Sequence, residues 1–265
     1  MGYERITPME TEAGSSVRGL FQLGRSCGWH NFIGCSASRW LGPQDIATCQ
    51  SYLDWNAEYR TIDGVAVPSL ARECFVFSQQ VGVRYESGKS PEQSSFLVLQ
   101  IDDSGSKYRI LWEGVEDHHP PMELNIQLVM HASRKIGPGN VVYHCQPLNI
   151  LALAAIDRKR NVDLLDDLSG GYAAIHNVIP DGIESVPWGM KEPIRREMRM
   201  SPSMQRDMRA FISKIGEHAR ACSTILLEGE GLLCSSWSAE NVFCIINTLE
   251  HSAEIRLKML AAGIE

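Results

Sequence analysis

The sequence predicts a layered α/β domain, and three kinds of segment indicate this fold class. Short runs rich in β-branched and aromatic residues predict strands, and two long segments with apolar residues at the helical period predict amphipathic helices. A buried strand with a helix on either side lies in the middle of the chain. Helices that alternate with buried strands are typical of layered α/β folds. The 265 residues, 44% of them hydrophobic, suffice for one domain over 1–265.

The N-terminal part of the chain predicts only one element. The first dozen residues are polar, so we expect residues 1–14 to form a loose segment. Apolar residues within Ser15–Gly24 favour a short helix, with Val17, Leu20, Phe21 and Leu23 as its apolar positions. The stretch from Leu41 to Val67 shows no clear period and gives no prediction.

Three strand candidates follow in the sequence. They are Cys74–Ser78, Phe96–Ile101 and Tyr108–Trp112, which read CFVFS, FLVLQI and YRILW. The turn-forming residues of segment 102–105, DDSG, separate the last two. We therefore expect these two strands to pair as a hairpin.

The middle of the chain predicts a helix, a strand and a second helix. Apolar residues fall on one helical face after Pro120 and Pro121, which can open a helix, and the sequence GPG at 137–139 stops it. Segment 140–145, NVVYHC, predicts a buried strand. Segment 148–156, LNILALAAI, is apolar nearly all round, so we expect a buried helix.

Two long helices and a strand are predicted near the C-terminus. The first helix carries apolar residues from Met204 to Ala219 and the second from Val242 to Leu260, both at the 3.6-residue period. Ser238 is the expected N-cap of the second. Segment 224–227, TILL, predicts a strand between them.

Composition argues against several classes of protein. The net charge is −7, and acidic residues flank the basic runs 158–160 and 195–196, so we expect no nucleic-acid partner. No apolar run approaches the length of about 18 residues that a membrane span needs, and we expect no membrane partner. The eight cysteines form no C-x-x-C pair, which favours free thiols in a reducing, cytoplasmic setting.

A few polar residues at the ends of predicted elements could carry chemistry. His144 ends a buried strand, Glu123 lies in the first turn of the preceding helix, and Glu228 and Glu230 follow the TILL strand. One histidine and several carboxylates could form a hard-metal site or a general-base site. The alternative is a hydrogen-bonded core histidine with surface acids that cap helices.

One long segment resembles a known family. The sequence ILWEG followed by PPMELNIQLVMHASRKIGPGNVVYHCQPLNILALAAI is similar to the class II aldolase/adducin family, and to the bacterial rhamnulose-1-phosphate aldolases in particular. Pro180-Asp181-Gly182, Pro187-Trp188 and the segment from Ile225 to Leu260 extend the resemblance, which covers about Phe96 to Leu260. It implies a single-domain layered α/β/α fold with a central, mostly antiparallel sheet.

The resemblance also implies a chemistry. Such enzymes cleave a ketose 1-phosphate into dihydroxyacetone phosphate and an aldehyde, which for rhamnulose 1-phosphate is lactaldehyde. Three histidines hold a zinc ion that polarises the ketone, and a glutamate moves the proton. Loops rich in Gly, Asn and Ser hold the phosphate. A homotetramer with active sites between subunits is the usual assembly, so the implied partners are a small phosphorylated sugar and further copies of this chain.

The family's site carries over to this chain only in part. Glu123 matches the catalytic glutamate and His144 the first zinc histidine. The positions of the second and third zinc histidines hold Gln146 and Glu230. A further acidic position of the family falls on Ala174.

The phosphate loop changes as well. Its residues match Gly34, Cys35 and Ser78, and Cys35 stands where the family has an asparagine.

These replacements leave two hypotheses open. One imidazole, one amide and one carboxylate suit Mn²⁺ or Mg²⁺ better than Zn²⁺, and they bind a metal more weakly than three imidazoles, if they bind one at all. Either the chain is a working lyase with an altered metal or substrate, or its aldolase activity is reduced or lost. In the second case it could be a non-catalytic, adducin-like assembly or binding module. The retained Glu123 and His144 favour the first hypothesis, and the replacements favour the second.

Overall fold

The computed structural model describes residues 6–30, 35–78, 96–114, 123–133, 140–187 and 202–264. Within this part, nine strands form one sheet: β1 (Ser36–Leu41), β2 (Arg60–Thr61), β3 (Cys74–Ser78), β4 (Phe96–Ile101), β5 (Lys107–Glu113), β6 (Val141–Cys145), β7 (Ile183–Pro187), β8 (Thr224–Glu228) and β9 (Gly231–Ser236). Their order is β2-β5-β4-β3-β1-β6-β9-β8-β7. Only β7 and β8 pair in parallel among these strands, so the predicted mostly antiparallel sheet is confirmed.

Helices and short 3₁₀ turns make up the other described elements. They are η1 (Pro8–Glu10), α1 (Glu12–Ser26), α2 (Pro43–Cys49), η2 (Gln50–Tyr52), η3 (Pro68–Leu70), α3 (Leu124–Ser133), α4 (Leu148–Arg160), α5 (Leu164–Gly171), α6 (Ile175–Val178), α7 (Pro202–Ala221) and α8 (Ala239–Ala261). No described helix is both long enough and apolar enough to span a bilayer.

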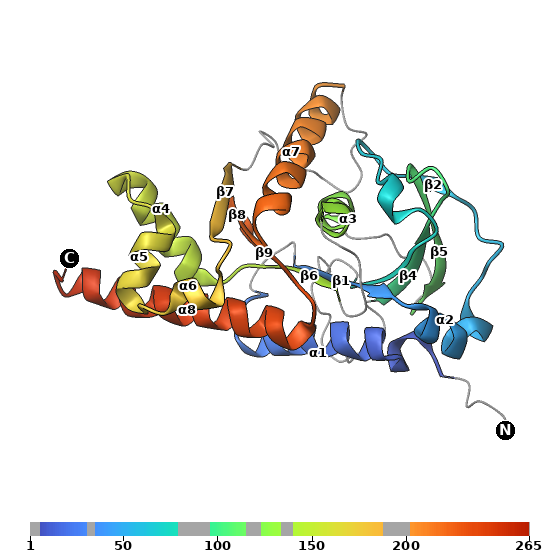
Figure 1. Cartoon of the computed structure of the whole chain (residues 1–265), viewed down its shortest axis with the longest axis horizontal. Helices are drawn as coiled ribbons and strands as arrows, with labels where there is room; N and C mark the ends of the chain where they lie inside the picture. Colours follow the sequence, from blue (N-terminus) through green and yellow to red (C-terminus); the bar gives the residue numbers. More distant parts are fainter. Residues whose placement is uncertain are drawn as a thin grey trace, which may run out of the picture.

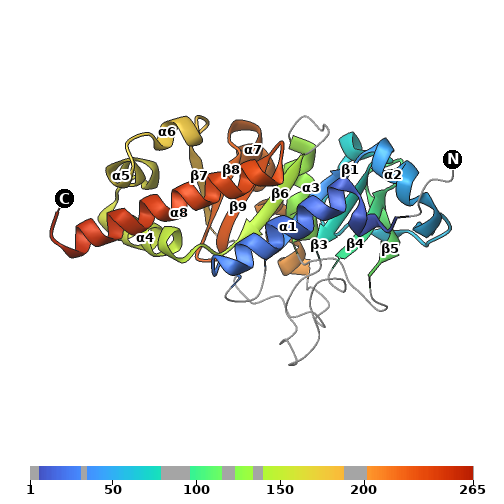
Figure 2. The same ribbon diagram turned by 90° about the horizontal axis from the view of Figure 1, so that it is seen from below.

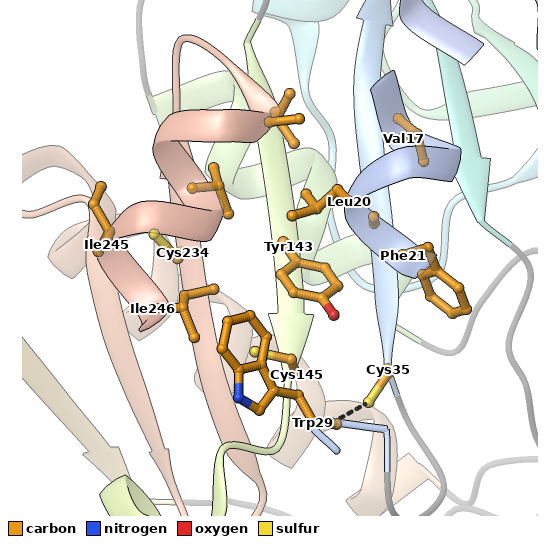
Figure 3. Close-up of a cluster of buried hydrophobic side chains, with 14 of the residues drawn as sticks. Val17, Leu20, Phe21, Trp29, Cys35, Tyr143, Cys145, Cys234, Ile245 and Ile246 are labelled. Carbon is orange, nitrogen blue, oxygen red and sulfur yellow. Dashed lines mark hydrogen bonds between the residues drawn. The ribbon is translucent and has the colours of Figure 1, made fainter. Parts of the chain in front are cut away.

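Helices cover both faces of the sheet. α1 and α8 lie on one face, while α3 and α7 lie on the other (Figures 1 and 2). Each face has its own apolar core. On the first, Val17 and Leu20 of α1 and Ile246 of α8 pack around Tyr143 of β6 (Figure 3). This arrangement confirms the α/β/α layers.

The second core lies between the sheet and the helices α3 and α7. Leu128 of α3 and Ile215 of α7 are fully buried there, against Phe75 of β3 and Val142 of β6. Two-residue alternation along the strands sends neighbouring side chains to opposite faces. Val142 therefore belongs to this core, while Tyr143 belongs to the first.

Several predicted elements agree with the structure. The predicted strands at 74–78 and 96–101 match β3 and β4, and the hairpin of β4 with β5 is confirmed. The two long C-terminal helices are α7 and α8. The N-cap is confirmed too, because the Ser238 hydroxyl accepts a hydrogen bond from the Asn241 backbone N–H at 3.1 Å. The stop signal at 137–139 lies outside the described residues.

The prediction of a loose segment over 1–14 is wrong for its second half. Pro8–Glu10 form η1, and α1 begins at Glu12. The Thr11 hydroxyl caps α1 by accepting a hydrogen bond from the Gly14 N–H at 3.1 Å. Gly14 lies against Pro8, where a side chain would meet the Pro8 carbonyl oxygen at 2.2 Å. A helix cap and a close backbone contact fix this segment, whereas polar composition alone suggests a loose one.

Two further predictions about burial are wrong. Leu23, expected on the apolar face of α1, is 45% exposed. α4 is not buried all round, because Leu148 and Ile156 are exposed and only Ile150, Leu153 and Asp157 are buried. Figure 1 shows α4 at one end of the molecule, where it packs beside α5 and α8 rather than between layers.

Candidate active site

Several of the predicted site residues lie at one edge of the sheet, the one formed by the ends of its central strands, where β1 begins and β6 ends. Ser36 of β1 pairs with His144 of β6, and His144 also pairs with Leu233 of β9. The tight turn between β8 and β9, which contains Glu230, therefore lies at the same edge. Figure 3 shows Cys35 and Cys145 near this end of the two strands, beside Trp29. Three strands thus bring together residues that are far apart in the sequence.

Glu123 and His144 form a buried pair. The Glu123 Oε1 atom lies 3.8 Å from His144 Nδ1, and the two side chains are 7% and 1% exposed. The pKa of Glu123 is raised to about 7, mainly by burial and also by the charge of Glu230, while hydrogen bonds from its own backbone and from the Ser36 hydroxyl act in the other direction. A carboxyl group that titrates near neutral pH can both accept and donate a proton, as a general base must.

Glu230 reaches this site through a turn that requires glycine at two positions. Gly229 has a φ of +81°, which glycine adopts without strain. Gly231 lies against His144, because a Cβ at position 231 would come within 2.5 Å of the imidazole Nε2 and 2.6 Å of the Cys145 carbonyl oxygen. Burial raises the pKa of Glu230 as well. The Gly231 contact therefore places the β8–β9 turn against His144, and the role of Glu230 as a metal ligand stays a prediction.

Cys35 is a buried neutral thiol at this edge. Burial raises its pKa to about 12, and the negative charges of Glu123 and Glu230 contribute to the shift. Its Sγ donates a hydrogen bond to the Trp29 carbonyl oxygen at 3.2 Å, and the Gln146 backbone N–H donates to the same oxygen at 3.0 Å. Because the thiolate is the reactive form, such a cysteine is a poor nucleophile at neutral pH.

Ser36 and Gln127 also lie at the site, and the sequence analysis did not select them. The Gln127 side-chain Nε2 donates a hydrogen bond to the Ser36 hydroxyl, and both residues are fully buried. Gln127 lies one helical turn after Glu123, on the same face of α3. The only sequence signal is this four-residue spacing of two polar residues in an apolar helix.

The remaining predicted positions have different outcomes. The Ser78 hydroxyl is buried at the end of β3 and accepts a hydrogen bond from the Ala37 backbone N–H at 2.6 Å, so it holds β1 against β3. Gly34 and Trp188 lie outside the described residues. Ala174 lies at the start of α6. The role of Cys35, Ser78 and Gly34 in binding phosphate stays a prediction.

The described residues do not fit the zinc centre that the family resemblance implies. In the part of the chain that the structure describes, no group of three His, Cys, Asp or Glu side chains is arranged to hold a metal ion. At the three positions in question, the donors are the His144 imidazole, the Gln146 amide and the Glu230 carboxylate. Structural and catalytic zinc sites use imidazole, thiolate and carboxylate ligands, and an amide oxygen is a weak substitute.

Relatives by sequence are named as sugar-phosphate lyases, although no protein-family model matches the chain. The chain is 26% identical over 240 residues to rhamnulose-1-phosphate aldolase of Klebsiella pneumoniae, with 89% of this chain and 80% of the relative covered. It is 25% identical over 239 residues to rhamnulose-1-phosphate aldolase of Pectobacterium atrosepticum, with 89% and 81% covered. The resemblance stated from the sequence is thus supported over most of the chain.

Solved structures confirm the fold. A sugar-phosphate aldolase from Thermotoga maritima matches with a TM-score of 0.68 and 18% identity, covering 94% of this chain and 96% of that one. An aldolase II superfamily protein from Pseudomonas syringae matches with a TM-score of 0.54 and 16% identity, covering 98% and 79%. The fold is that of the class II aldolases.

Proposed function

We propose that this chain, a rhamnulose-1-phosphate aldolase-like protein with the class II aldolase fold, has reduced or lost the aldol cleavage that its relatives' name describes. The observation that carries the proposal is the donor set at the positions that the resemblance implies: His144, Gln146 and Glu230, where three imidazoles would be needed. An amide and an anionic carboxylate leave a bound dication less able to polarise a ketone.

A loss of substrate affinity would accompany the loss of the metal. The Cys35 thiol is buried and neutral and donates to a backbone carbonyl, so it offers no strong donor to a phosphate. The Ser78 side chain is fully buried against the backbone of β1, from which its hydroxyl accepts a bond. Phosphate binding usually relies on several backbone N–H groups, hydroxyls or basic side chains. A ketose 1-phosphate would therefore bind weakly at this edge.

A working lyase that uses another metal is the second candidate function, and the burial and raised pKa of Glu123 favour it. The Glu123 Oε2 atom is buried and makes no hydrogen bond within the described part of the chain. A buried carboxyl group with a pKa near 7 and an unused oxygen is suited to move a proton of a substrate. In such a lyase His144, Gln146 and Glu230 would hold Mn²⁺ or Mg²⁺, which are cations that bind well to oxygen ligands.

Product release measured with different metal ions distinguishes the two candidate functions. The full chain, purified without chelator, would be incubated with rhamnulose 1-phosphate and with Zn²⁺, Mn²⁺ or Mg²⁺ in turn, and dihydroxyacetone phosphate would be measured. We expect no release at an ordinary enzymatic rate, which is about 1 s⁻¹ or more. Release at such a rate with Zn²⁺ would contradict the proposal. Release with Mn²⁺ or Mg²⁺ alone, abolished by His144→Ala, would establish the second candidate.

A gain-of-binding variant tests the same idea in the other direction. The double substitution Gln146→His with Glu230→His would restore three imidazoles, and we expect it to retain stoichiometric zinc through purification when the parent chain does not. Gln146→Asn with Glu230→Gln is the matched control, since it changes the same positions without adding an imidazole. Equal zinc content in all three proteins would show that these positions do not form the metal site.

A further inference from the structure

A cavity in the described part of the chain lies at the opposite end of β6 from the candidate active site. Its volume is about 510 Å³, and its walls include the start of β6, the end of β9, the end of α3 and the first turns of α8. Cavities of 300–1,000 Å³ are typical of small-molecule sites. Figure 2 shows the start of α8 beside β6 and β9, which contribute two of these walls.

α3 runs from the candidate active site to the cavity. Glu123 precedes the first turn of α3, and His131, eight residues later, lies about 12 Å further along the helix axis and lines the cavity. Ser36 and Ser38 of β1 follow the same line, since Ser36 accepts from Gln127 and the Ser38 hydroxyl lies 2.9 Å from His131 Nε2. The two sites are thus separate, and one helix supports both.

His131 has an unused hydrogen-bonding atom inside the protein. The side chain is 1% exposed, and its Nδ1 atom has no hydrogen-bond partner in the described part of the chain. Burial lowers the pKa of His131 to about 3, so the imidazole is neutral and has one donor and one acceptor nitrogen. A buried polar atom without a partner is unfavourable unless water or a ligand pairs with it.

The other walls combine hydroxyl, amide and carboxylate groups with apolar side chains. The polar lining residues besides His131 are Asn140, Asp181, Ser223, Ser235, Ser236 and Asn241. Among the described residues that line this cavity, which exclude segment 134–139, there is no lysine or arginine. A phosphate or carboxylate ligand would meet Asp181 without a cation to balance it, so a neutral ligand rich in hydroxyl groups fits the walls better.

Trp237 supplies an aromatic surface at the cavity. Its side chain is 68% exposed, the most exposed of the large apolar side chains in the described ranges. An indole presents a broad apolar face together with one N–H donor, which matches molecules that have an apolar side and polar edges. A sugar ring has this character, with C–H groups on its faces and hydroxyl groups around its rim.

We propose that this cavity is a second binding site that takes a neutral, polyhydroxylated molecule such as an unphosphorylated sugar. The buried His131 closes the inner end of the cavity, the serine and asparagine side chains of the walls offer hydrogen bonds, and Trp237 covers one face of the ring at the outer end. The site is independent of the proposed function, because none of its lining residues belongs to the candidate active site.

Calorimetric titration of the full chain with L-rhamnose, and separately with inorganic phosphate, tests this site. We expect the sugar to bind and phosphate not to bind or compete. Trp237→Ala should weaken sugar binding about tenfold or more, while Trp237→Phe, which keeps an aromatic face, should retain most of the affinity. Tyr52→Ala is the matched control, since Tyr52 is an exposed aromatic residue in η2 that lies outside the cavity.

Three outcomes would overturn the proposal. The first is that neither L-rhamnose nor a second neutral hexose, D-glucose, binds. The second is that Trp237→Ala leaves the affinity unchanged. The third is that no sugar binds while Trp237→Ala lowers the mass of the protein in solution, which would assign the Trp237 surface to a contact between copies of the chain. Glu123→Gln should leave sugar binding unchanged, so this test fails or succeeds independently of the aldolase assay.

Discussion

The Glu123 carboxylate lies 3.8 Å from the His144 imidazole, and both side chains are almost completely buried. The contact joins the start of α3 to the end of β6, which are separated by a segment of about twenty residues. It places an acid with a raised pKa beside the His144 imidazole. The protonation of this pair therefore bears directly on what proton chemistry this edge of the sheet can perform.

The raised pKa of Glu123 predicts that the protein loses stability as the pH rises from 4.5 to 7. The folded state keeps the Glu123 proton up to a pH of about 7, whereas the unfolded state releases it near 4.5. In that window the folded state binds more protons, and the free energy of unfolding falls by roughly 3 kcal/mol in total from this group. Glu123→Gln should remove this contribution, as urea unfolding at pH 5 and pH 8 would measure. An equal pH dependence in both proteins would contradict the assignment.

Gly231 is predicted to tolerate no side chain. A methyl group there would overlap His144 Nε2 at 2.5 Å and the Cys145 carbonyl oxygen at 2.6 Å, so Gly231→Ala must move β6 or the imidazole. We expect a loss of about 1–3 kcal/mol in the free energy of unfolding. The control is Gly19→Ala in α1, where nothing lies within 4 Å of the added methyl group and a gain of up to about 1 kcal/mol is expected. Equal effects of the two substitutions would argue against the close contact.

The bond between Gln127 and Ser36 predicts non-additive substitutions. Ser36→Ala leaves the Gln127 Nε2 donor buried without its acceptor, which costs about 1–3 kcal/mol. Gln127→Met removes the donor with little change of volume, so the double variant should lose less stability than the sum of the two single variants. Ser36→Ala should also move the protonation of Glu123 to higher pH, because the Ser36 hydroxyl lowers the pKa of that group. Strict additivity in chemical denaturation would contradict the pairing.

Arg256 is predicted to be essential for the packing of α5 on α8. Its Nε atom donates to Asp167 Oδ1 at 2.7 Å, and the two side chains are 8% and 5% exposed. Arg256→Leu would leave the buried Asp167 carboxylate with Arg160 as its remaining cationic partner at 3.0 Å, at a cost of about 3 kcal/mol. Adding Asp167→Asn should recover much of the lost melting temperature, since an amide needs no cation. A double variant no more stable than Arg256→Leu would show that shape, rather than charge, is lost.

Elements with a strong local signal were predictable from the sequence. β3 and β4 are rich in apolar, β-branched and aromatic residues, and α7 and α8 have apolar residues at the helical period. β1 was missed, because its sequence SASRWL has little strand propensity of its own. It is a central strand only because β3 and β6 pair with it on both sides. Strand propensity depends on such neighbours more than on the residues themselves.

The difference between local sequence and neighbouring elements also explains why α4 is not buried all round. Its sequence is apolar on every side, which favours burial, but the helix lies at the end of the molecule and only one side packs against α8. Periodicity describes which residues are apolar, whereas the neighbours that cover them come from the path of the whole chain. Exposure of Leu148 and Ile156 therefore had no signal in the sequence.

For the candidate site, the sequence by itself determined the chemical types: an acid at the start of a helix, a histidine at a strand end, and an amide and a carboxylate at the positions where the resemblance implies two imidazoles. The tertiary structure decided the burial, the protonation and the hydrogen bonds of these residues. Pairing of β1, β6 and β9 buries Glu123 beside His144, brings Ser36 and Gln127 to the same edge, and leaves His131 buried at the other end of α3. Desolvation raises the pKa of Glu123, and the pairing of distant segments completes the hydrogen bond between Gln127 and Ser36. Both effects depend on distances that only the folded chain fixes.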